Sequence, residues 1–186
     1  MGGNSSTSSS SSSYTSSNSS TISKPKSPEK QKMSKEEENA LDAEFQKLKN
    51  SKIVPVVKCE YINNDKKHWK VVFEGSKRSP YENGFFILEF LFNNGVFPQI
   101  GPEAKFITKM FHPNVAENGH VCINLLNSWD PKRSIEKVLY GILEIMDNPQ
   151  ASGGYSNKAK ELLEKNVEEF FKKVEEYTYT YAMNSF

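Results

Sequence analysis

One short polar stretch, HPNVAENGHVC at residues 112–122, holds residue types that could do acyl-transfer chemistry. The sulfur of a cysteine attacks acyl carbons well and is also a good leaving group. Cysteine usually prefers a buried position, but Cys122 follows the segment ENGH at 117–120, which is rich in turn-forming residues. An exposed polar loop suits a reactive thiolate better than a hydrophobic core does. From these residues alone, Cys122 is either a nucleophile or a structural cysteine.

The second cysteine, Cys59, lies in a different setting. In the segment VVKCEY at 56–61, strand alternation places Cys59 on the same face as Val57 and Tyr61, while the intervening charged residues point away. We therefore predict that Cys59 is a core residue. Two cysteines 63 positions apart do not form the framework of a disulfide-rich secreted protein. A reducing compartment, the cytoplasm or the nucleus, is therefore expected.

The composition argues against several classes of protein. The chain has 186 residues and a formal net charge of +1, so it has no excess of basic charge to attract nucleic acid. The longest apolar run, GFFILEFLF at 84–92, is too short for a membrane span, and the N-terminus lacks a signal-peptide pattern. The three histidines do not have metal-ligand spacing with either cysteine, so no metal site is expected.

The first 33 residues differ in composition from the rest. Residues 1–23 are dominated by serine and residues 24–33 are basic, so we predict a disordered extension over 1–33 and a folded domain over 34–186. The opening MGGNSS matches the N-myristoylation motif, with Gly2 as the acceptor. One acyl chain binds membranes only weakly, but nearby lysines supply a second, electrostatic signal. Membrane association through the N-terminus is therefore an open alternative.

The folded part begins with a helix and continues with strands. Ser34 and Glu37 form a capping box, after which apolar residues recur at helical spacing to about Asn50. Strand-like segments follow at 54–62, 68–73, 85–92 and 104–108. Sequential strands joined by short turns predict an antiparallel meander. Ser134 and Ser156 each begin a further helical pattern, and the second pattern predicts one helix as far as Val174. This order indicates an α+β domain.

The stretch around Cys122 resembles the active-site signature of ubiquitin-conjugating enzymes, in which a His-Pro-Asn motif (here 112–114) precedes the cysteine. Other segments similar to that family follow the family's order: Trp69, SPYENGFF (79–86), FPQIGP (97–102), Trp129 to Pro131, VLYGILEIM (138–146) and YTYTYAM (177–183). The resemblance covers about residues 34–183. It implies the UBC-like fold, with an N-terminal helix, a four-stranded antiparallel meander and C-terminal helices.

The resemblance also implies a transferase that carries ubiquitin as a thioester on Cys122. The modifier would come from an activating enzyme and pass to a ligase cysteine or to a lysine of a protein substrate. Asn114 would donate its amide to the oxyanion or hold the cysteine loop in shape, and these roles are not exclusive. His112 would brace the loop rather than act as a base. ATP would be used by the activating enzyme, so no bound cofactor is expected.

Two acidic positions of the family are missing from this sequence. Members commonly place an acidic residue beside the cysteine, where it orients or deprotonates the substrate amine. The corresponding loop, DNPQASGGYSN at 147–157, has no carboxylate at its gate positions near Ser152 and Gly153, and Asn124 stands where many members have aspartate. Either Ser152 substitutes by hydrogen bonding, or the cargo passes mainly to a ligase cysteine.

The resemblance assigns partner binding to two loops, which contain Phe97, Pro98 and Gln99, and Trp129 and Pro131. Gln99 stands where the family often offers a phenylalanine, and an interface that loses an aromatic anchor usually loses a hot spot. We therefore expect an altered set of ligases. The other interpretation is that these are solvated loop positions.

Two alternatives to a ubiquitin carrier stay open. The segments CINL (122–125) and NNGVFPQIGP (93–102) also resemble conjugating enzymes of the Nedd/Rub ubiquitin-like modifier, whereas Trp69 and the SPYENG turn favour ubiquitin. A non-catalytic scaffold or binding protein with the same fold is the other alternative. The missing gate acids favour a scaffold, and the cysteine in its full His-Pro-Asn context argues against it.

Overall fold

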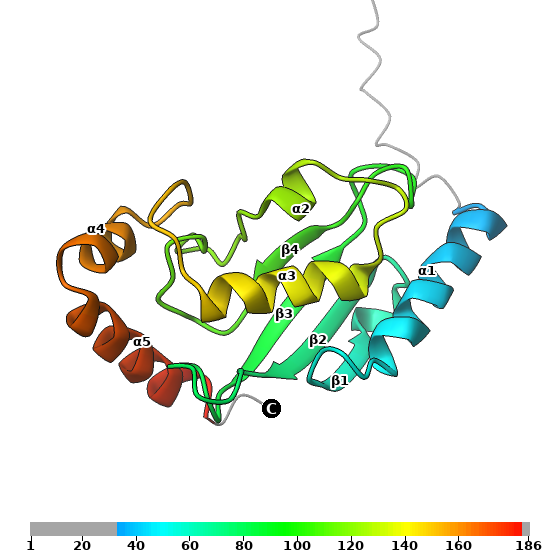
Figure 1. Ribbon diagram of the computed structural model, residues 1–186. Helices are drawn as coiled ribbons and strands as arrows, with labels where there is room; N and C mark the ends of the chain where they lie inside the picture. The colour runs from blue at the N-terminus through cyan, green and yellow to red at the C-terminus, as the bar shows by residue number, and fades with distance from the viewer. Residues whose placement is uncertain (1–32, 184–186) are drawn as a thin grey trace, which may run out of the picture. The chain divides into compact units, whose positions relative to one another are not determined.

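A four-stranded antiparallel sheet lies at the centre of the fold in this computed structural model, which describes residues 33–183 (Figure 1). The strands pair in the order in which they occur in the chain, so the sheet is the predicted meander. They are β1 (Val56–Tyr61), β2 (His68–Glu74), β3 (Phe85–Leu91) and β4 (Glu103–Phe106). Residues 1–32, with Gly2 and almost all of the predicted extension, lie outside the described residues, as do residues 184–186.

Helices surround this sheet. They are α1 (Lys35–Lys49), the 3₁₀ turn η1 (Ile62–Asn64), α2 (Asn124–Asn127), α3 (Ile135–Asp147), α4 (Asn157–Lys165) and α5 (Val167–Tyr181). Helix α3 crosses one face of the sheet, α1 packs against both β1 and α3, and α4 and α5 lie toward the other end of the domain (Figure 1). The α+β architecture expected from the sequence is therefore confirmed. No helix among residues 33–183 is long and apolar enough to cross a membrane.

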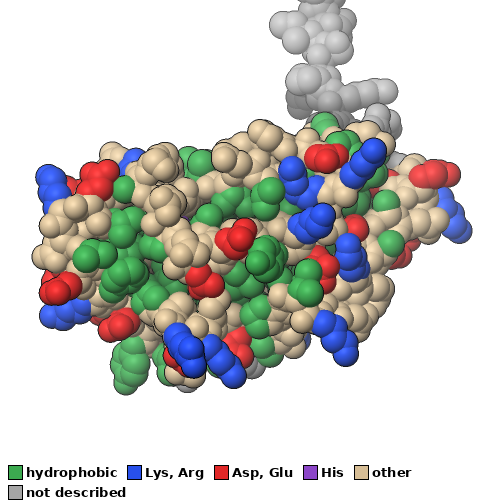
Figure 2. Space-filling model, in the orientation of Figure 1, with side chains coloured by type: hydrophobic (Ala, Val, Ile, Leu, Met, Phe, Trp, Pro, Cys, Tyr) green, Lys and Arg blue, Asp and Glu red, His purple; other side chains and the backbone are tan. Residues whose placement is uncertain are grey.

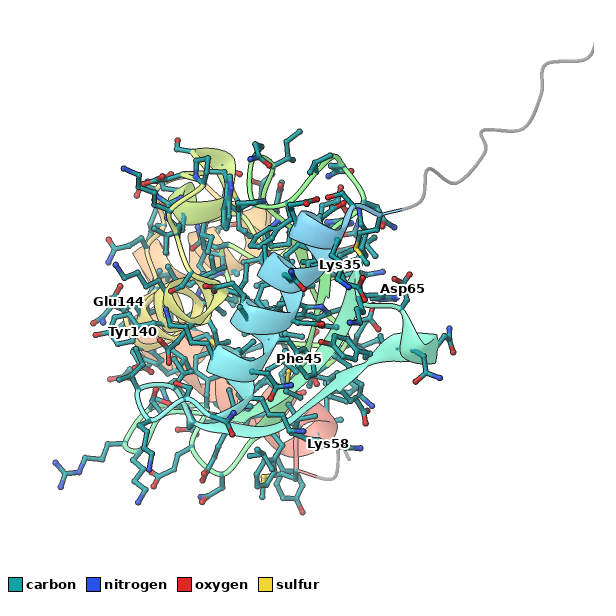
Figure 3. The ribbon with its side chains drawn as sticks, turned by 90° about the vertical axis from the view of Figure 1, so that its right-hand side faces the viewer. Lys35, Phe45, Lys58, Asp65, Tyr140 and Glu144 are labelled. Carbon is teal, nitrogen blue, oxygen red and sulfur yellow. The ribbon has the colours of Figure 1, made fainter. Side chains whose placement is uncertain are left out.

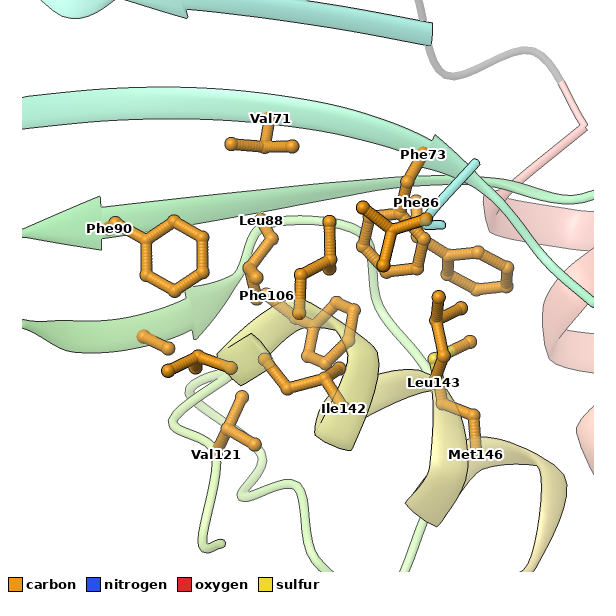
Figure 4. Close-up of a cluster of buried hydrophobic side chains, with 14 of the residues drawn as sticks. Val71, Phe73, Phe86, Leu88, Phe90, Phe106, Val121, Ile142, Leu143 and Met146 are labelled. Atoms are coloured by element: carbon orange, nitrogen blue, oxygen red, sulfur yellow. The ribbon is translucent and has the colours of Figure 1, made fainter. Parts of the chain in front are cut away.

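The core forms between the sheet and α3. Alternate side chains of β2 and β3 point to the same face and are fully buried, as period-two strands require. The apolar residues of α3 recur every three or four positions and meet them (Figure 4). Figure 4 shows Phe86, Leu88 and Phe106 from the strands facing Ile142 and Leu143 of α3.

The first helix begins as the sequence predicts, because the Ser34 hydroxyl accepts the amide N–H of Glu37. Phe45 lies on the side of α1 that faces the sheet, whereas Tyr140 and Glu144 lie on the outer side of α3 (Figure 3). The space-filling view shows hydrophobic patches between scattered charged side chains on the face that α3 crosses (Figure 2). One such exposed apolar side chain on α3 is Tyr140.

The expectation that Val57 shares a face of strand β1 with Cys59 is wrong. Cys59 is buried as predicted, but Val57 is 48% exposed and does not share its environment. The pairing register shifts between Val56 and Lys58, which face Phe73 and Val72 of β2. Val57 is therefore the extra residue of a β-bulge, and a bulge interrupts the alternation on which the expectation depended.

The C-terminal helical pattern also differs from its expectation. Ser156 caps a helix as predicted, but the single helix expected to reach Val174 is divided into α4 and α5 at Asn166. Asn166 has a non-helical backbone, and its side chain accepts the amide N–H of Glu169. An asparagine side chain competes with the helical backbone for such donors and so begins a new helix. The apolar periodicity continues across the break and conceals it.

Candidate active site

Cys122 lies at the end of a narrow loop that is bonded to the edge of the sheet. Its amide N–H donates to the Asn114 carbonyl at 2.8 Å, and Val115 and Val121 form an antiparallel bridge. Gly119 turns the chain with a φ of 88°, a conformation that glycine adopts without steric cost. The flanking Val121 and Ile123 are buried, whereas Cys122 is half-buried. The buried neighbours fix the loop and leave the thiol accessible.

His112 is buried beneath this loop, with 1% of its surface exposed. Its Nε2–H donates to the Ile145 carbonyl on α3 at 2.8 Å, while its Nδ1 accepts the Asn114 amide N–H at 2.9 Å. This pair of bonds requires a neutral ring with the proton on Nε2. Burial lowers the pKa of His112 to about 4, and the bond to the Ile145 carbonyl offsets only part of that effect. Both ring nitrogens are occupied, so the ring connects the loop to α3.

Asn114 lies beside Cys122 and is bonded to it through both its main chain and its side chain. Its Nδ2–H donates to the main-chain carbonyl of Cys122 at 3.3 Å. Its Oδ1 is buried and has no hydrogen-bond partner among the described residues. In this arrangement the side-chain donor holds the backbone at the cysteine.

A residue that the sequence analysis did not single out reaches the thiol. The side-chain amide of Asn127, the last residue of α2, lies 3.7 Å from the Cys122 Sγ and is exposed. The guanidinium of Arg133 donates to the carbonyls of Leu125 and Ser128 at 2.6 and 2.8 Å, and so fixes the end of α2. No helical pattern predicted α2, because four residues are too few to show a periodicity.

The segment expected to form the gate is joined to the His-Pro-Asn motif through its backbone. The amide N–H groups of Tyr155 and Ser156 both donate to the Pro113 carbonyl, at 2.8 and 3.0 Å. Gly154 approaches the same carbonyl so closely that an added Cβ would lie 2.4 Å from its oxygen. Ser152 is exposed and makes no described hydrogen bond to Cys122. The backbone of 154–156, not the Ser152 side chain, is what contacts the motif.

The two loops expected to bind partners lie against each other. The indole Nε1–H of Trp129 donates to the Pro98 carbonyl at 2.8 Å, and the Trp129 ring lies 6.2 Å from that of Phe97. Phe97 is only 3% exposed, so its side chain supports the loop from inside rather than offering a contact surface. Gln99 and Pro131 are exposed, as expected of partner-binding residues.

Two exposed apolar residues of the first loop were missed by the sequence analysis. Val96 and Ile100, which flank the buried Phe97 and the exposed Gln99, are 55% and 46% exposed. Their spacing around a proline gave no periodicity from which exposure could be predicted. They supply the apolar surface that a glutamine at position 99 does not.

A groove of about 430 Å³ runs between these loops and the cysteine loop. Its walls include Gln99, His120, Asn127, Trp129 and Tyr155, which come from four separate segments of the chain. The geometry therefore places an accessible thiol beside a channel and beside exposed loop residues.

The other cysteine does not share these properties. Burial raises the pKa of the Cys59 thiol to about 12. A thiol held in its neutral form is a poor nucleophile. Among residues 33–183, no group of three histidine, cysteine or carboxylate side chains could hold a metal ion.

These features define an α+β domain that presents one accessible thiol in a braced loop. Residues 34–178 match the model of the family described as ubiquitin-conjugating enzyme. The chain is 32% identical over 133 residues to ubiquitin-conjugating enzyme E2 N of Macaca fascicularis, a match that spans 71% of this chain and 87% of that protein. It is also 32% identical over 130 residues to ubiquitin-conjugating enzyme E2 13 of Saccharomyces cerevisiae, across 69% of this chain and 84% of that one.

A solved structure has the same fold. The E2 domain of a ubiquitin conjugating enzyme of Toxoplasma gondii superposes with a TM-score of 0.72 and 24% identity, covering 78% of this chain and 99% of that one. The chain belongs to the ubiquitin-conjugating enzyme family. The resemblance drawn from the His-Pro-Asn motif and the order of segments is thereby confirmed.

Proposed function

We propose that this protein accepts ubiquitin from an activating enzyme as a thioester on Cys122 and passes it on. The single observation that carries this proposal is the contrast between the two cysteines. Cys122 is half-buried in a loop braced by His112 and Asn114, whereas Cys59 is buried and its pKa is raised to about 12. Membership of the family supports the reaction class, and the printed names of the relatives favour ubiquitin as the cargo.

The proposed charging step is a thioester exchange. The Cys122 thiolate attacks the carbonyl carbon of the modifier's C-terminus on the activating enzyme, and that enzyme's thiolate leaves. The new S–C bond has nearly the energy of the old one, so the protein needs no cofactor of its own. ATP is consumed earlier, by the activating enzyme. Asn114 and His112 support this step by fixing the backbone on which the sulfur is carried.

For release, we propose that a ligase cysteine is the preferred acceptor. A substrate lysine has a pKa of about 10.4, so neutralising it at pH 7 costs roughly 4–5 kcal/mol. No carboxylate among residues 33–183 makes a described hydrogen bond or ion pair with Cys122, Asn124 or Ser152, where an acid could assist. A thiol acceptor ionises much closer to neutrality and needs less assistance. Ser152 stays a candidate for orienting a lysine.

The partner surface that we propose consists of Val96, Gln99, Ile100 and Pro131. The first three residues surround the buried Phe97, and Pro131 follows Trp129, which is bonded to the same loop. Apolar side chains exposed beside a rigid loop can serve as anchors for a ligase. Gln99 adds polar recognition where an aromatic anchor is absent.

The test is a charging assay with the full chain, ATP, an activating enzyme and its modifier, read on a non-reducing gel. We expect a shifted band that thiol removes. Cys122→Ser should abolish it or convert it to a thiol-resistant ester, and the matched control Cys59→Ser should charge normally. Ubiquitin and the Nedd/Rub modifier are each tested with their own activating enzyme. A band only with the Nedd/Rub modifier would change the cargo, and no band with either, from folded protein, would favour a scaffold.

We further propose that the protein works in the cytoplasm or the nucleus, with membrane association only if Gly2 is myristoylated. Labelling with a myristate analogue tests the second part. No incorporation at Gly2 in cells that label a control protein would remove the membrane alternative.

A further inference from the structure

The side chain of Asn127 has the geometry of a hydrogen-bond donor to the reacting sulfur. Its Nδ2 lies 3.7 Å from the Cys122 Sγ, and the described residues offer this amide no other hydrogen bond. By contrast, the amide of Asn114 is already bonded to the Cys122 carbonyl. Of the side chains in the structure, the one aimed at the sulfur itself is therefore Asn127.

The helix that carries Asn127 is fixed at both of its ends. Its start follows the buried Ile123. Its last turn is bonded through the Leu125 and Ser128 carbonyls to Arg133, whose guanidinium also lies 5.8 Å from the Trp129 ring.

Helix α2 is also seated on α3. Leu125 occupies the space above Gly141, where an added Cβ would lie 2.3 Å from its Cδ1. A larger residue at 141 would push α2 away from α3. Packing and hydrogen bonds together thus fix the backbone of α2 from which the Asn127 side chain extends toward the thiol.

We propose that Asn127 is a further catalytic residue, whose amide stabilises the Cys122 thiolate as it leaves the thioester. This inference rests on the proposed function of Cys122. In the transfer step, an acceptor thiolate attacks the thioester carbonyl, a new S–C bond forms, and the bond to Cys122 breaks. The bonding electron pair stays on Sγ as a thiolate, and the Asn127 N–H donates to it. With a neutral amine acceptor, a C–N bond forms instead and the extra proton passes to solvent.

The same hydrogen bond favours the departure of Cys122 more than its attack. It increases the fraction of thiolate but makes each thiolate a weaker nucleophile, so about half of the gain cancels when Cys122 attacks. When Cys122 departs, stabilisation of the thiolate lowers the barrier without that cancellation. Removing the donor should therefore slow discharge more than charging.

The experiment compares Asn127→Ala and Asn127→Asp with the matched control Ser128→Ala. Ser128 is the exposed residue next to Asn127, and its described hydrogen bonds are made by its backbone. Each variant of the full chain is charged with ubiquitin, and its discharge to free cysteine is followed in a single turnover. In uncharged protein, the rate of alkylation of Cys122 by iodoacetamide is measured against pH by mass spectrometry of the cysteine-containing peptide.

We expect Asn127→Ala to slow discharge by roughly tenfold, since it removes a hydrogen bond to a sulfur that becomes charged as it leaves. Its alkylation profile should shift to higher pH and should end on a higher plateau than the wild type, because the less stabilised thiolate is more nucleophilic. A displaced loop does not explain an alkylation rate that is below the wild-type rate at low pH and above it at high pH. Asn127→Asp should be slower than Asn127→Ala, because a carboxylate repels the thiolate, and Ser128→Ala should match the wild type.

Two results would overturn the proposal: an Asn127→Ala protein with wild-type discharge and an unshifted profile, or a Ser128→Ala protein with the same losses as Asn127→Ala. Failure of the wild type to charge would instead count against the proposed function. The alkylation profiles would still test Asn127 in that case, because they need no modifier.

Discussion

Asn114 and Cys122 are bonded to each other twice across the cysteine loop. The Cys122 amide N–H donates to the Asn114 carbonyl at 2.8 Å, and the Asn114 side-chain amide donates back to the Cys122 carbonyl at 3.3 Å. His112 accepts the Asn114 amide N–H and joins the pair to α3. The backbone that carries the thiol is therefore determined by the motif that precedes it.

Asn114→Ala should impair charging and discharge together. If the main role of the amide is to hold the loop, its loss displaces the sulfur in both reactions, and we expect each to slow by about tenfold or more. The free energy of unfolding should fall by only about 1 kcal/mol, because one partly buried hydrogen bond is lost. Single-turnover gels and urea denaturation measure these effects. Wild-type rates for both reactions would contradict a role of this amide in the site.

His112 should make stability depend on pH in mildly acidic solution. Its pKa falls from 6.5 to about 4 on folding, because burial penalises the charged ring. Between these values the unfolded chain binds more protons than the folded one, so stability decreases as the pH falls. This contribution is present above pH 6.5 and amounts to about 2 kcal/mol between pH 7.5 and pH 5.

The measurement is urea unfolding of the wild type and of His112→Gln at these two pH values. Glutamine cannot titrate, so the variant lacks this component. The difference in unfolding free energy between the two proteins should therefore shrink by about 2 kcal/mol at pH 5. A difference that stays constant with pH would contradict a buried, neutral His112.

Glu37 should stabilise the loop that contains Phe97 from inside the domain. It is 4% exposed, accepts the Phe97 amide N–H at 3.1 Å, and forms an ion pair with Lys67 at 2.6 Å. Glu37→Ala should lower the free energy of unfolding by about 3 kcal/mol, because it removes one member of a largely buried pair. Ligase binding should weaken as the loop loosens.

The double variant Glu37→Gln/Lys67→Met separates charge from hydrogen bonding. It removes both charges but leaves an amide oxygen that can accept from Phe97. We expect it to recover at least about 1 kcal/mol relative to Glu37→Ala. If the double variant were the less stable protein, the ion pair would be a net stabiliser.

Gly153 and Gly154 form a matched pair for testing the contact between residues 154–156 and the His-Pro-Asn motif. Both have a positive φ, 75° and 76°, but an added Cβ at Gly153 meets nothing within 4 Å, whereas at Gly154 it lies 2.4 Å from the Pro113 oxygen. Gly153→Ala should cost about 1 kcal/mol through backbone strain alone. Gly154→Ala should cost at least about 1 kcal/mol more, because the clash adds to the strain.

Activity should separate this pair more sharply than stability does. Gly154→Ala displaces the amides of Tyr155 and Ser156 from the Pro113 carbonyl, next to Asn114, and should slow charging. Gly153→Ala should charge at close to the wild-type rate in the same gel assay. Equal charging by the two variants would mean that the contact at Pro113 has no part in positioning the loop.

Short-range patterns in the sequence predicted most of the elements. Ser34, Ser134 and Ser156 each cap a helix as expected, and the four strands occur in the expected order. These signals are local, because a cap needs only three neighbouring residues and an alternation needs only one strand. The break at Asn166 was also local, since asparagine and Glu169 form a capping pair there, but a continuous apolar pattern concealed it.

The sequence by itself predicted the residues of the candidate site, because Cys122, Asn114 and His112 occur together in one motif. The tertiary structure alone decided what they touch. It placed Ile145 of α3 on His112, Asn127 on the sulfur, Pro113 under the gate segment, and Phe97 inside the domain rather than on its surface. The physical reason is that the spacing of these residues along the chain matches neither the period of a helix or strand nor a local capping pattern. The sequence pattern therefore does not show that they are in contact. Packing of α3 and the sheet around one core brings them together.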